Sequence, residues 1–295
     1  MANQIQSYLL TDKIKNTIEK ITIGFSIIGF LVHLILIVGV HFNIIDAGNN
    51  DLLKNPISSI YTPFSFILFY EVYLLIFYLP KSTSKYIGKQ YEIITLIVIR
   101  KVFKDLGSLD LNDNFFKTKT DIIFLIDLGT VLILFALILF FYKINNDKPK
   151  HNDMVSKEIK TFINVKKWIA FALVPLFFTL SAISLTGWVI GLVNKNINNI
   201  GIHVDTNMIF FDSFFTVLIV TDVLILLISF LLTDKFQTVM RNSGFIISTI
   251  LIKISFGTTG ILNNILVVTA ILFGVCILYL YNKHNELEAK TLTSV

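Results

Sequence analysis

Charged residues and cysteine are both scarce in this sequence of 295 residues. Only 15% of the residues are charged, whereas 54% are hydrophobic, and the mean hydropathy is +0.74. A soluble globular protein of this length cannot bury so large an apolar fraction, so the composition excludes that class. The single cysteine, Cys276, excludes an intramolecular disulfide and any CxxC redox or metal site.

The sequence also lacks the motifs of several enzyme classes. It contains no GxxxxGK[ST] phosphate loop, no HExxH pair and no GxSxG nucleophile elbow. Asp127 and Asp222 do not lie in the glycine-rich or tyrosine-aspartate setting that intramembrane aspartate proteases use. The sequence therefore predicts a protein that is not an enzyme and that holds no cofactor or metal.

Long apolar runs dominate the sequence instead. Runs close to 20 residues are long enough to cross the hydrocarbon core of a bilayer as helices. The first, Ile21 to Ile45, is longer than a signal-peptide core and has no small-residue cleavage site, so we expect it to be retained. The others cover residues 57–79, 91–103, 121–142, 168–193, 208–232, 245–256 and 260–281. This pattern predicts an all-α polytopic membrane protein.

Two of these runs, 91–103 and 245–256, are short, which leaves two topologies open. If both cross, the chain has eight spans, and 17 of the 25 Lys and Arg residues lie on the side of the N-terminus. If both are interfacial or re-entrant, there are six spans, and only 14 of the Lys and Arg residues lie on the side of the N-terminus. Because cytoplasmic loops carry the excess of positive charge, eight spans with both termini cytoplasmic are favoured. We expect the plasma (inner) membrane. The same loop placement explains the net charge of +5 without a nucleic-acid partner.

The polar segments divide the sequence into two halves of four spans. We expect a cytoplasmic N-terminal segment, a first half, a cytoplasmic linker, a second half and a cytoplasmic tail, at 1–20, 21–143, 144–167, 168–281 and 282–295. The halves align with Glu71 on Asp222, Arg100 on Lys253 and Thr130 on Thr269. This internal repeat predicts two parallel four-helix bundles related by an axis along the membrane normal.

With an acid on the second of its four helices, each half resembles a voltage-sensing four-helix domain in outline. The resemblance implies a topology in which the chain crosses the membrane four times per half. The sequence departs from that family's pattern because the fourth segments, 121–142 and 260–281, carry no cation. An architectural likeness of this kind says little about function.

Charged residues inside the apolar runs are the candidate functional residues, because burying a charge in hydrocarbon costs several kcal/mol unless a partner or water compensates it. We expect Glu71 to pair with Arg100 and Asp222 with Lys253, whereas Asp127 has no evident partner in its half. Secondary candidates are His33, Lys101 and Lys104. His33 is interpreted as a neutral histidine that is hydrogen-bonded inside the bundle.

Two functions fit these residues. In the first, the acids and cations line a hydrated path for protons or small cations in an ion channel or secondary transporter. In the second, they form structural ion pairs in a non-catalytic membrane subunit or scaffold. The expected partners are the lipid bilayer and either further copies of the chain or another membrane subunit.

Overall fold

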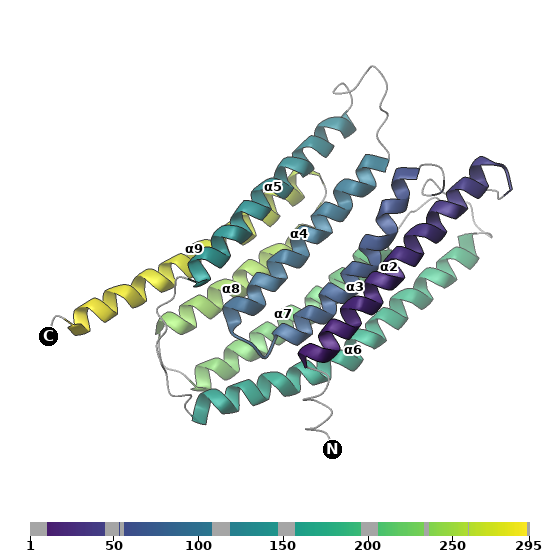
Figure 1. Ribbon diagram of the computed structural model, residues 1–295. Coiled ribbons are helices and arrows are strands. Elements are labelled where there is room, and N and C mark those ends of the chain that lie inside the picture. The colour runs from purple at the N-terminus through teal and green to yellow at the C-terminus, as the bar shows by residue number, and fades with distance from the viewer. Residues whose placement is uncertain are drawn as a thin grey trace. The chain divides into compact units, whose positions relative to one another are not determined.

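In a computed structural model, the described residues are nearly all helical and include no strand. The described ranges are 11–44, 53, 56–107, 119–146, 157–195, 206–232, 236–258 and 260–293. Within them lie one 3₁₀ helix, η2 (Pro56–Ile60), and eight α-helices (Figure 1). The helices are α2 (Asp12–His41), α3 (Tyr61–Tyr78), α4 (Thr83–Gly107), α5 (Lys119–Asn146), α6 (Lys157–Lys195), α7 (Thr206–Leu232), α8 (Phe236–Phe256) and α9 (Ile261–Thr293).

The helix ends follow local chemistry. After α2, Asn43 adopts a left-handed conformation with φ of 54°. Its amide donates to the carbonyl of Val40 at 3.0 Å, and the amide of Ile44 donates to that of Gly39 at 2.9 Å. This bonding pattern is the Schellman motif, which satisfies carbonyl groups that the last turn of a helix leaves open. Because asparagine tolerates the left-handed region better than most residues, the sequence ends α2 here.

The two short apolar runs belong to longer helices. Residues 91–103 lie within α4, which has 25 residues, and residues 245–256 lie within α8, which has 21. At 1.5 Å per residue these helices extend about 37 and 31 Å, enough for a hydrocarbon core of roughly 30 Å. The predicted starts were too late because Lys85, Lys89 and Arg241, assigned to loops, lie inside the helices.

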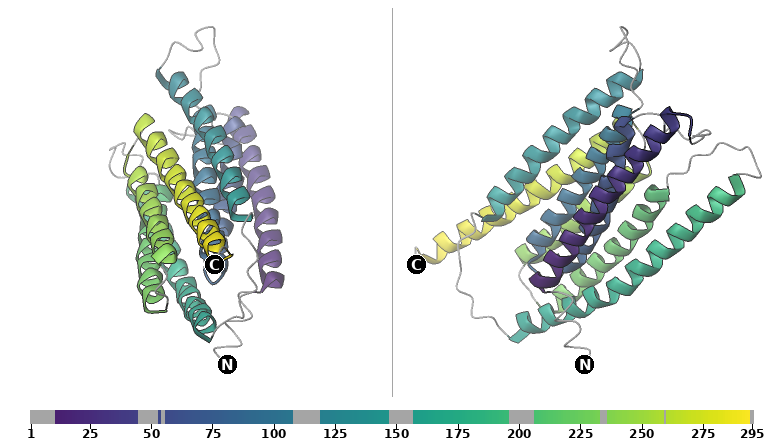
Figure 2. Two further views of the ribbon diagram at one scale, coloured as in Figure 1. Left: turned by 90° about the vertical axis from the view of Figure 1, so that its left-hand side faces the viewer. Right: turned by 45° about the vertical axis from the view of Figure 1, so that its right-hand side comes forward.

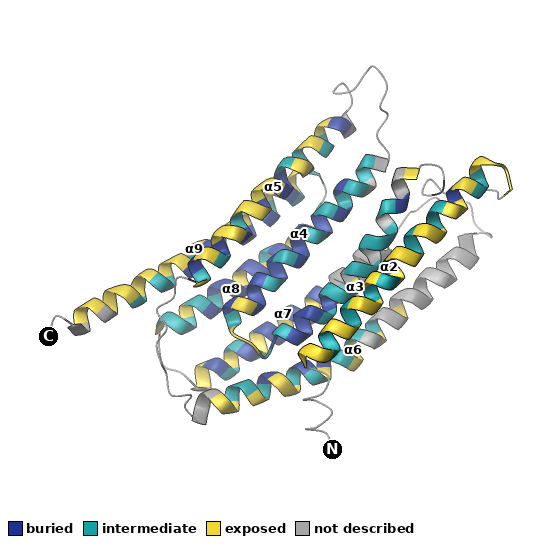
Figure 3. Cartoon of the chain, viewed as in Figure 1, coloured by how far each residue is buried: buried dark blue, intermediate teal, exposed yellow. Residues whose placement is uncertain are grey.

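Five of the helical segments are both long enough and apolar enough to cross a membrane. They are Asp12–His41, Asp121–Asn146, Ser213–Leu231, Phe236–Phe256 and Ile261–Glu288, and Thr62–Tyr78 is a shorter apolar helix. On α2, large apolar side chains such as Phe25, Leu31 and Ile35 are more than half exposed (Figure 3). Such a surface is unfavourable in water but suits contact with lipid. The described part of the chain is therefore nearly all helical, and its helices are long and apolar enough for an integral membrane protein.

The chain divides into two compact units. Unit 1 comprises Met1–Tyr78 and Lys85–Phe140, and unit 2 comprises Leu79–Ser84 and Phe141–Val295. In unit 1, α2 packs against α3, and a Cβ atom placed on Gly29 would lie only 2.6 Å from the ring of Phe66 (Figure 1). The rings of Phe64 and Phe103 stack at 4.8 Å and join α3 to α4. The missing side chain of Gly29 thus permits the close approach of α2 and α3.

In unit 2, each helix packs against the next one in the sequence: α6 against α7, α7 against α8 and α8 against α9 (Figure 2). A Cβ atom on Gly244 of α8 would lie 2.7 Å from the side chain of Ile277 on α9. Pro175 lies inside α6, where it removes one backbone hydrogen bond. Beyond the predicted end of the last span at Tyr281, α9 continues as a helix to Thr293.

Candidate functional site

The helix that carries most of the predicted charged residues of unit 1 is largely buried. In α4, buried residues include Tyr91, Ile94 and Val98, and the polar side chains of Gln90 and Arg100 are buried with them (Figure 3). The apolar helix α2 is exposed, by contrast, over much of its length. A polar helix inside and an apolar helix outside are what a membrane protein requires, because its exterior faces lipid.

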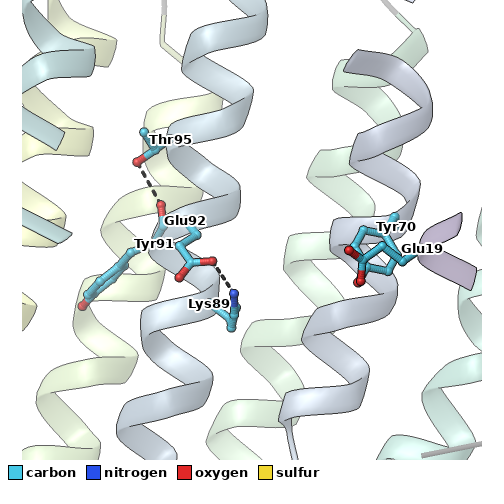
Figure 4. A network of polar contacts seen from close by, with 6 residues as sticks. All are labelled: Glu19, Tyr70, Lys89, Tyr91, Glu92 and Thr95. Carbon is cyan, nitrogen blue, oxygen red and sulfur yellow. Dashed lines mark hydrogen bonds and ion pairs between the residues drawn. The ribbon is translucent and has the colours of Figure 1, made fainter. Parts of the chain in front are cut away.

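Four polar side chains act on or lie next to one of the predicted acids, Glu71, and we call the five together the Glu71 cluster. It consists of Glu19 on α2, Tyr70 and Glu71 on α3, and Lys89 and Glu92 on α4. Lys89 Nζ lies 2.5 Å from Glu92 Oε2, and the Tyr70 hydroxyl donates to Glu19 Oε2 at 2.8 Å (Figure 4). Lys89, Glu92 and Glu19 all act electrostatically on Glu71. Oε2 of Glu71 is buried and has no hydrogen-bond partner among the described residues.

The cluster carries more negative than positive charge. Three carboxyl groups, those of Glu19, Glu71 and Glu92, share the single ammonium group of Lys89. Glu92 makes the direct contact with that ammonium, so Glu71 feels its attraction at longer range. The ring of Tyr78 lies 5.3 Å from Lys89 Nζ and adds a cation–π contact on the same side chain. The arrangement favours a further positive charge or a proton beside Glu71.

The expected pair between Glu71 and Arg100 is wrong. The charges that act on Glu71 are those of Lys89, Glu92 and Glu19. The reason is the position of the turn: α3 ends at Tyr78 and α4 begins at Thr83, so antiparallel packing brings Glu71 level with the first turns of α4. Arg100 follows Lys89 by three turns, or about 16 Å along the axis. It lies buried on α4, 5% exposed.

The expectation that Asp127 has no partner is also wrong. Lys101 Nζ lies 2.9 Å from Asp127 Oδ2, and the Asp127 side chain is 0% exposed. The contact is an ion pair rather than a well-directed hydrogen bond, and Oδ2 accepts no hydrogen bond from the described residues. Lys101, from α4, is 29% exposed. Sequence inspection missed the pair because the register between α4 and α5, which brings Lys101 to Asp127, cannot be read from the sequence.

In unit 2, the predicted acid Asp222 is opposed by a lysine that the sequence had placed in the linker. Asp222 on α7 is 6% exposed, and Lys166 on α6 is 3% exposed. Burial lowers the pKa of Lys166 to about 8, against an opposing attraction from Asp222 and with a further lowering by Arg241. Lys166 Nζ donates to the carbonyl of Lys81 at 3.4 Å and lies 4.9 Å from the centre of the Phe162 ring.

The remaining predicted residues lie apart from these groups. Lys253 is half-buried on α8, and its pairing with Asp222 stays a prediction. His33 Nδ1 lies 2.5 Å from the Thr62 hydroxyl, a hydrogen bond between α2 and α3. The backbone of Lys104 belongs to α4, but its side chain lies outside the described residues.

Residues that the sequence interpretation missed are Glu19, Lys89, Glu92, Lys166 and Arg241. Glu19, Lys89, Lys166 and Arg241 lie outside the predicted apolar runs, whereas Glu92 lies inside the run 91–103 but was not singled out. The sequence contains a signal for the earlier start of α4. Ser82 is a favourable N-cap residue, and Lys85, Lys89 and Glu92 follow it at helical spacing. In the structure these three residues lie on the most exposed stripe of α4.

Comparison of the chain with protein-family models, curated proteins and solved structures gives no match.

Proposed function

We propose that this protein is an integral membrane channel or secondary transporter for protons or small cations, and that the Glu71 cluster lies on its ion path. The observation that carries the proposal is the buried Oε2 of Glu71, which has no hydrogen-bond partner among the described residues and lies near two further acids. An acid in such a position is stabilised by a bound proton or cation. Ionisable groups within membrane segments commonly mark such paths.

The placement of polar residues supports the same function. The lipid-facing helix α2 exposes apolar side chains, and the charged residues of unit 1 gather along α4 and the faces of α3 and α5 that bear Glu71 and Asp127. Arg100 and Asp127 are therefore buried, whereas Lys89, Glu92 and Lys101 keep part of their side chains exposed. This is the arrangement expected of a polar path between helices.

The proposed topology has eight spans in two parallel four-helix repeats, with both termini in the cytoplasm and the protein in the plasma (inner) membrane. The lengths of α4 and α8 and the distribution of Lys and Arg support it. After replacement of Cys276, single cysteines at Asn112 and Asn152 should react with an impermeant maleimide from opposite sides. Labelling of both from one side contradicts the topology. Further copies of the chain, or another membrane subunit, are the proposed protein partners, and we propose no catalytic activity.

Flux measurements in liposomes test the function. Purified protein is reconstituted with a pH-sensitive dye inside the vesicles, and proton, sodium and potassium gradients are applied in turn. We expect flux with the unmodified chain and none with Glu71→Gln, which keeps the shape of the side chain but removes its charge. Glu286→Gln is the matched control because Glu286 is an exposed acid paired with Lys283. Unchanged flux in folded Glu71→Gln protein excludes this residue from the path.

A second candidate function, a non-catalytic membrane scaffold, is favoured by one observation. Two ion pairs lie in unit 1, Lys101 with Asp127 and Lys89 with Glu92. In each pair the charge of the lysine neutralises the charge of the acid. If these pairs only hold helices together, the reconstituted protein should conduct no ion under any gradient. Their disruption should then change stability alone.

A further inference from the structure

An arginine at one end of the α8 and α9 pair has only neutral side chains in contact with its guanidinium group. Arg241 lies on α8, and its Cζ atom lies 4.4 Å from the centre of the Tyr281 ring on α9. Its Nε and Nη2 donate to Oδ1 of Asn242 at 3.2 and 3.0 Å. It makes no ion pair with an acid in the part of the chain that the structure describes. Arg241 therefore keeps a positive charge that a bound anion can neutralise.

The contacts of Arg241 hold the guanidinium group in one orientation. Asn242 is 7% exposed, and its Nδ2 donates to the hydroxyl of Ser229 on α7 at 3.3 Å, which directs Oδ1 toward the arginine. Asn242 occupies the edge of the guanidinium that Nε and Nη2 form. The edge that Nη1 and Nη2 form has no hydrogen-bond partner among the described residues. Two parallel N–H groups on such an edge match two oxygens of a phosphate group.

This free edge lies at the depth of lipid headgroups. The hydroxyl of Ser248 on α8 donates to the carbonyl of Ala270 on α9 at 2.6 Å, and earlier in α8 Arg241 meets Tyr281, so the two helices are antiparallel. Tyr281 is the last residue of the apolar run 260–281, and polar residues follow it. Tyrosine is enriched at this level, where a helix leaves the hydrocarbon core. Arg241 is partly exposed, so a headgroup can reach it.

We propose that Arg241, held by Asn242 and Tyr281, binds the phosphate group of an anionic phospholipid in the inner leaflet. The proposed topology places this end of α8 and α9 on the cytoplasmic side, where the leaflet carries anionic lipids. Met240 and Leu280, which are adjacent to the two residues in the sequence, are 46% and 52% exposed and offer apolar surface to acyl chains. The site is independent of ion transport, since a channel and a scaffold can both bind lipid there.

Lipid binding to the purified protein in a neutral detergent tests the site. Phosphatidylglycerol is titrated, native mass spectrometry counts the bound lipids, and the unfolding temperature is recorded in parallel. We expect Arg241→Gln to weaken binding by roughly tenfold to hundredfold, the effect of losing charge-assisted hydrogen bonds. Arg241→Lys keeps the charge but lacks the paired N–H groups, so it should weaken binding by about tenfold. Lys283→Gln is the matched control and should bind as the parent does, because Lys283 is an exposed cation at the same end of α9, paired with Glu286.

Equal binding of phosphatidylglycerol to the parent and to Arg241→Gln overturns the proposal. Equal losses in Arg241→Gln and Lys283→Gln also overturn it, since the lipid then responds to overall charge. If Arg241→Gln does not fold, Arg241→Lys decides, because binding at full strength by that variant shows that the paired N–H groups are not used. Inorganic phosphate at the same concentration should not raise the unfolding temperature. If it stabilises the parent as much as phosphatidylglycerol does, the ligand is a soluble phosphate and the lipid is wrong.

Discussion

Units 1 and 2 each carry an acid within an apolar helix, Glu71 on α3 and Asp222 on α7, but the charges around the two acids differ. Glu71 lies near Glu19, Glu92 and one lysine, whereas Asp222 is opposed by the buried Lys166. The alignment of the halves scores these acids as equivalent because it compares residue types along the chain. The structure shows that the charges on neighbouring helices differ between the two acids.

A second difference concerns the ion pair between Lys101 and Asp127. The aligned positions of unit 2 are Ile254 and Leu266, so that unit carries apolar residues where unit 1 carries charge. If the halves arose by duplication, unit 1 has accumulated buried charge at these positions and unit 2 has not. Buried charge is costly, so this pair marks a local difference between the units, while unit 2 buries Lys166 and Asp222 elsewhere.

The largest expected effect comes from breaking this ion pair from the lysine side. Lys101→Met leaves the fully buried Asp127 carboxylate without this cation and should lower the free energy of unfolding by about 3–5 kcal/mol. Asp127→Asn should cost less, about 1 kcal/mol, since Lys101 is 29% exposed and its long side chain can reach water. Unfolding in mixed micelles measures both. Equal losses from the two variants would show that the burial of Asp127 does not determine the cost.

The next effect is a pH dependence that arises from Lys166 in unit 2. Burial lowers the pKa of Lys166 to about 8 from about 10.5. At a pH between these two values, folding therefore releases a proton from the lysine. The unfolded chain then binds more protons, so stability should rise as the pH increases from about 8 to 10.5, by on the order of 3 kcal/mol in total. Below pH 8 the lysine is charged in both states, and its contribution is constant.

Lys166→Met removes this contribution, so the difference in stability between the variant and the parent should change across that window and be constant below it. Lys160→Met, at an exposed position of α6, should show no such change. A difference between Lys166→Met and the parent that does not vary between pH 8 and 10.5 would contradict the burial of a charged lysine at this position.

The sequence predicts the fold class and the order of the helices well, because uninterrupted apolar runs have few alternatives to a membrane helix. It predicts helix ends poorly. The starts of α4 and α8 fall inside polar segments, where hydropathy does not indicate a helix and only capping residues such as Ser82 mark a boundary. The polar segments around α2 and α9 likewise continue as helix, since nothing in their sequence interrupts the backbone hydrogen bonds.

The candidate site could be predicted only in part. Hydropathy identifies Glu71, Asp127 and Asp222, because a charge within an apolar run is conspicuous. Their partners are hidden, since pairing depends on the register between helices, and an error of three turns exchanges Lys89 for Arg100. Lys166 was assigned to a linker because charge next to a span normally lies in the interface. Only the packing of α6 and α7 reveals that it is buried.

The smallest expected effect compares how closely the helices approach in each unit. Gly29 in unit 1 and Gly244 in unit 2 lack room for a methyl group: a Cβ atom would lie 2.6 Å from Phe66 and 2.7 Å from Ile277. Gly244→Ala should be the more costly, at about 1–3 kcal/mol, because three atoms of the branched Ile277 lie within 2.9 Å, whereas the Phe66 ring at Gly29 can rotate away. Gly24→Ala is the matched control, since nothing lies within 4 Å of its Cβ position and alanine favours a helix by roughly 1 kcal/mol over glycine. Thermal unfolding in detergent gives the order. If Gly244→Ala is as stable as Gly24→Ala, then α8 and α9 do not pack at this distance, and the tight packing inferred for unit 2 is wrong.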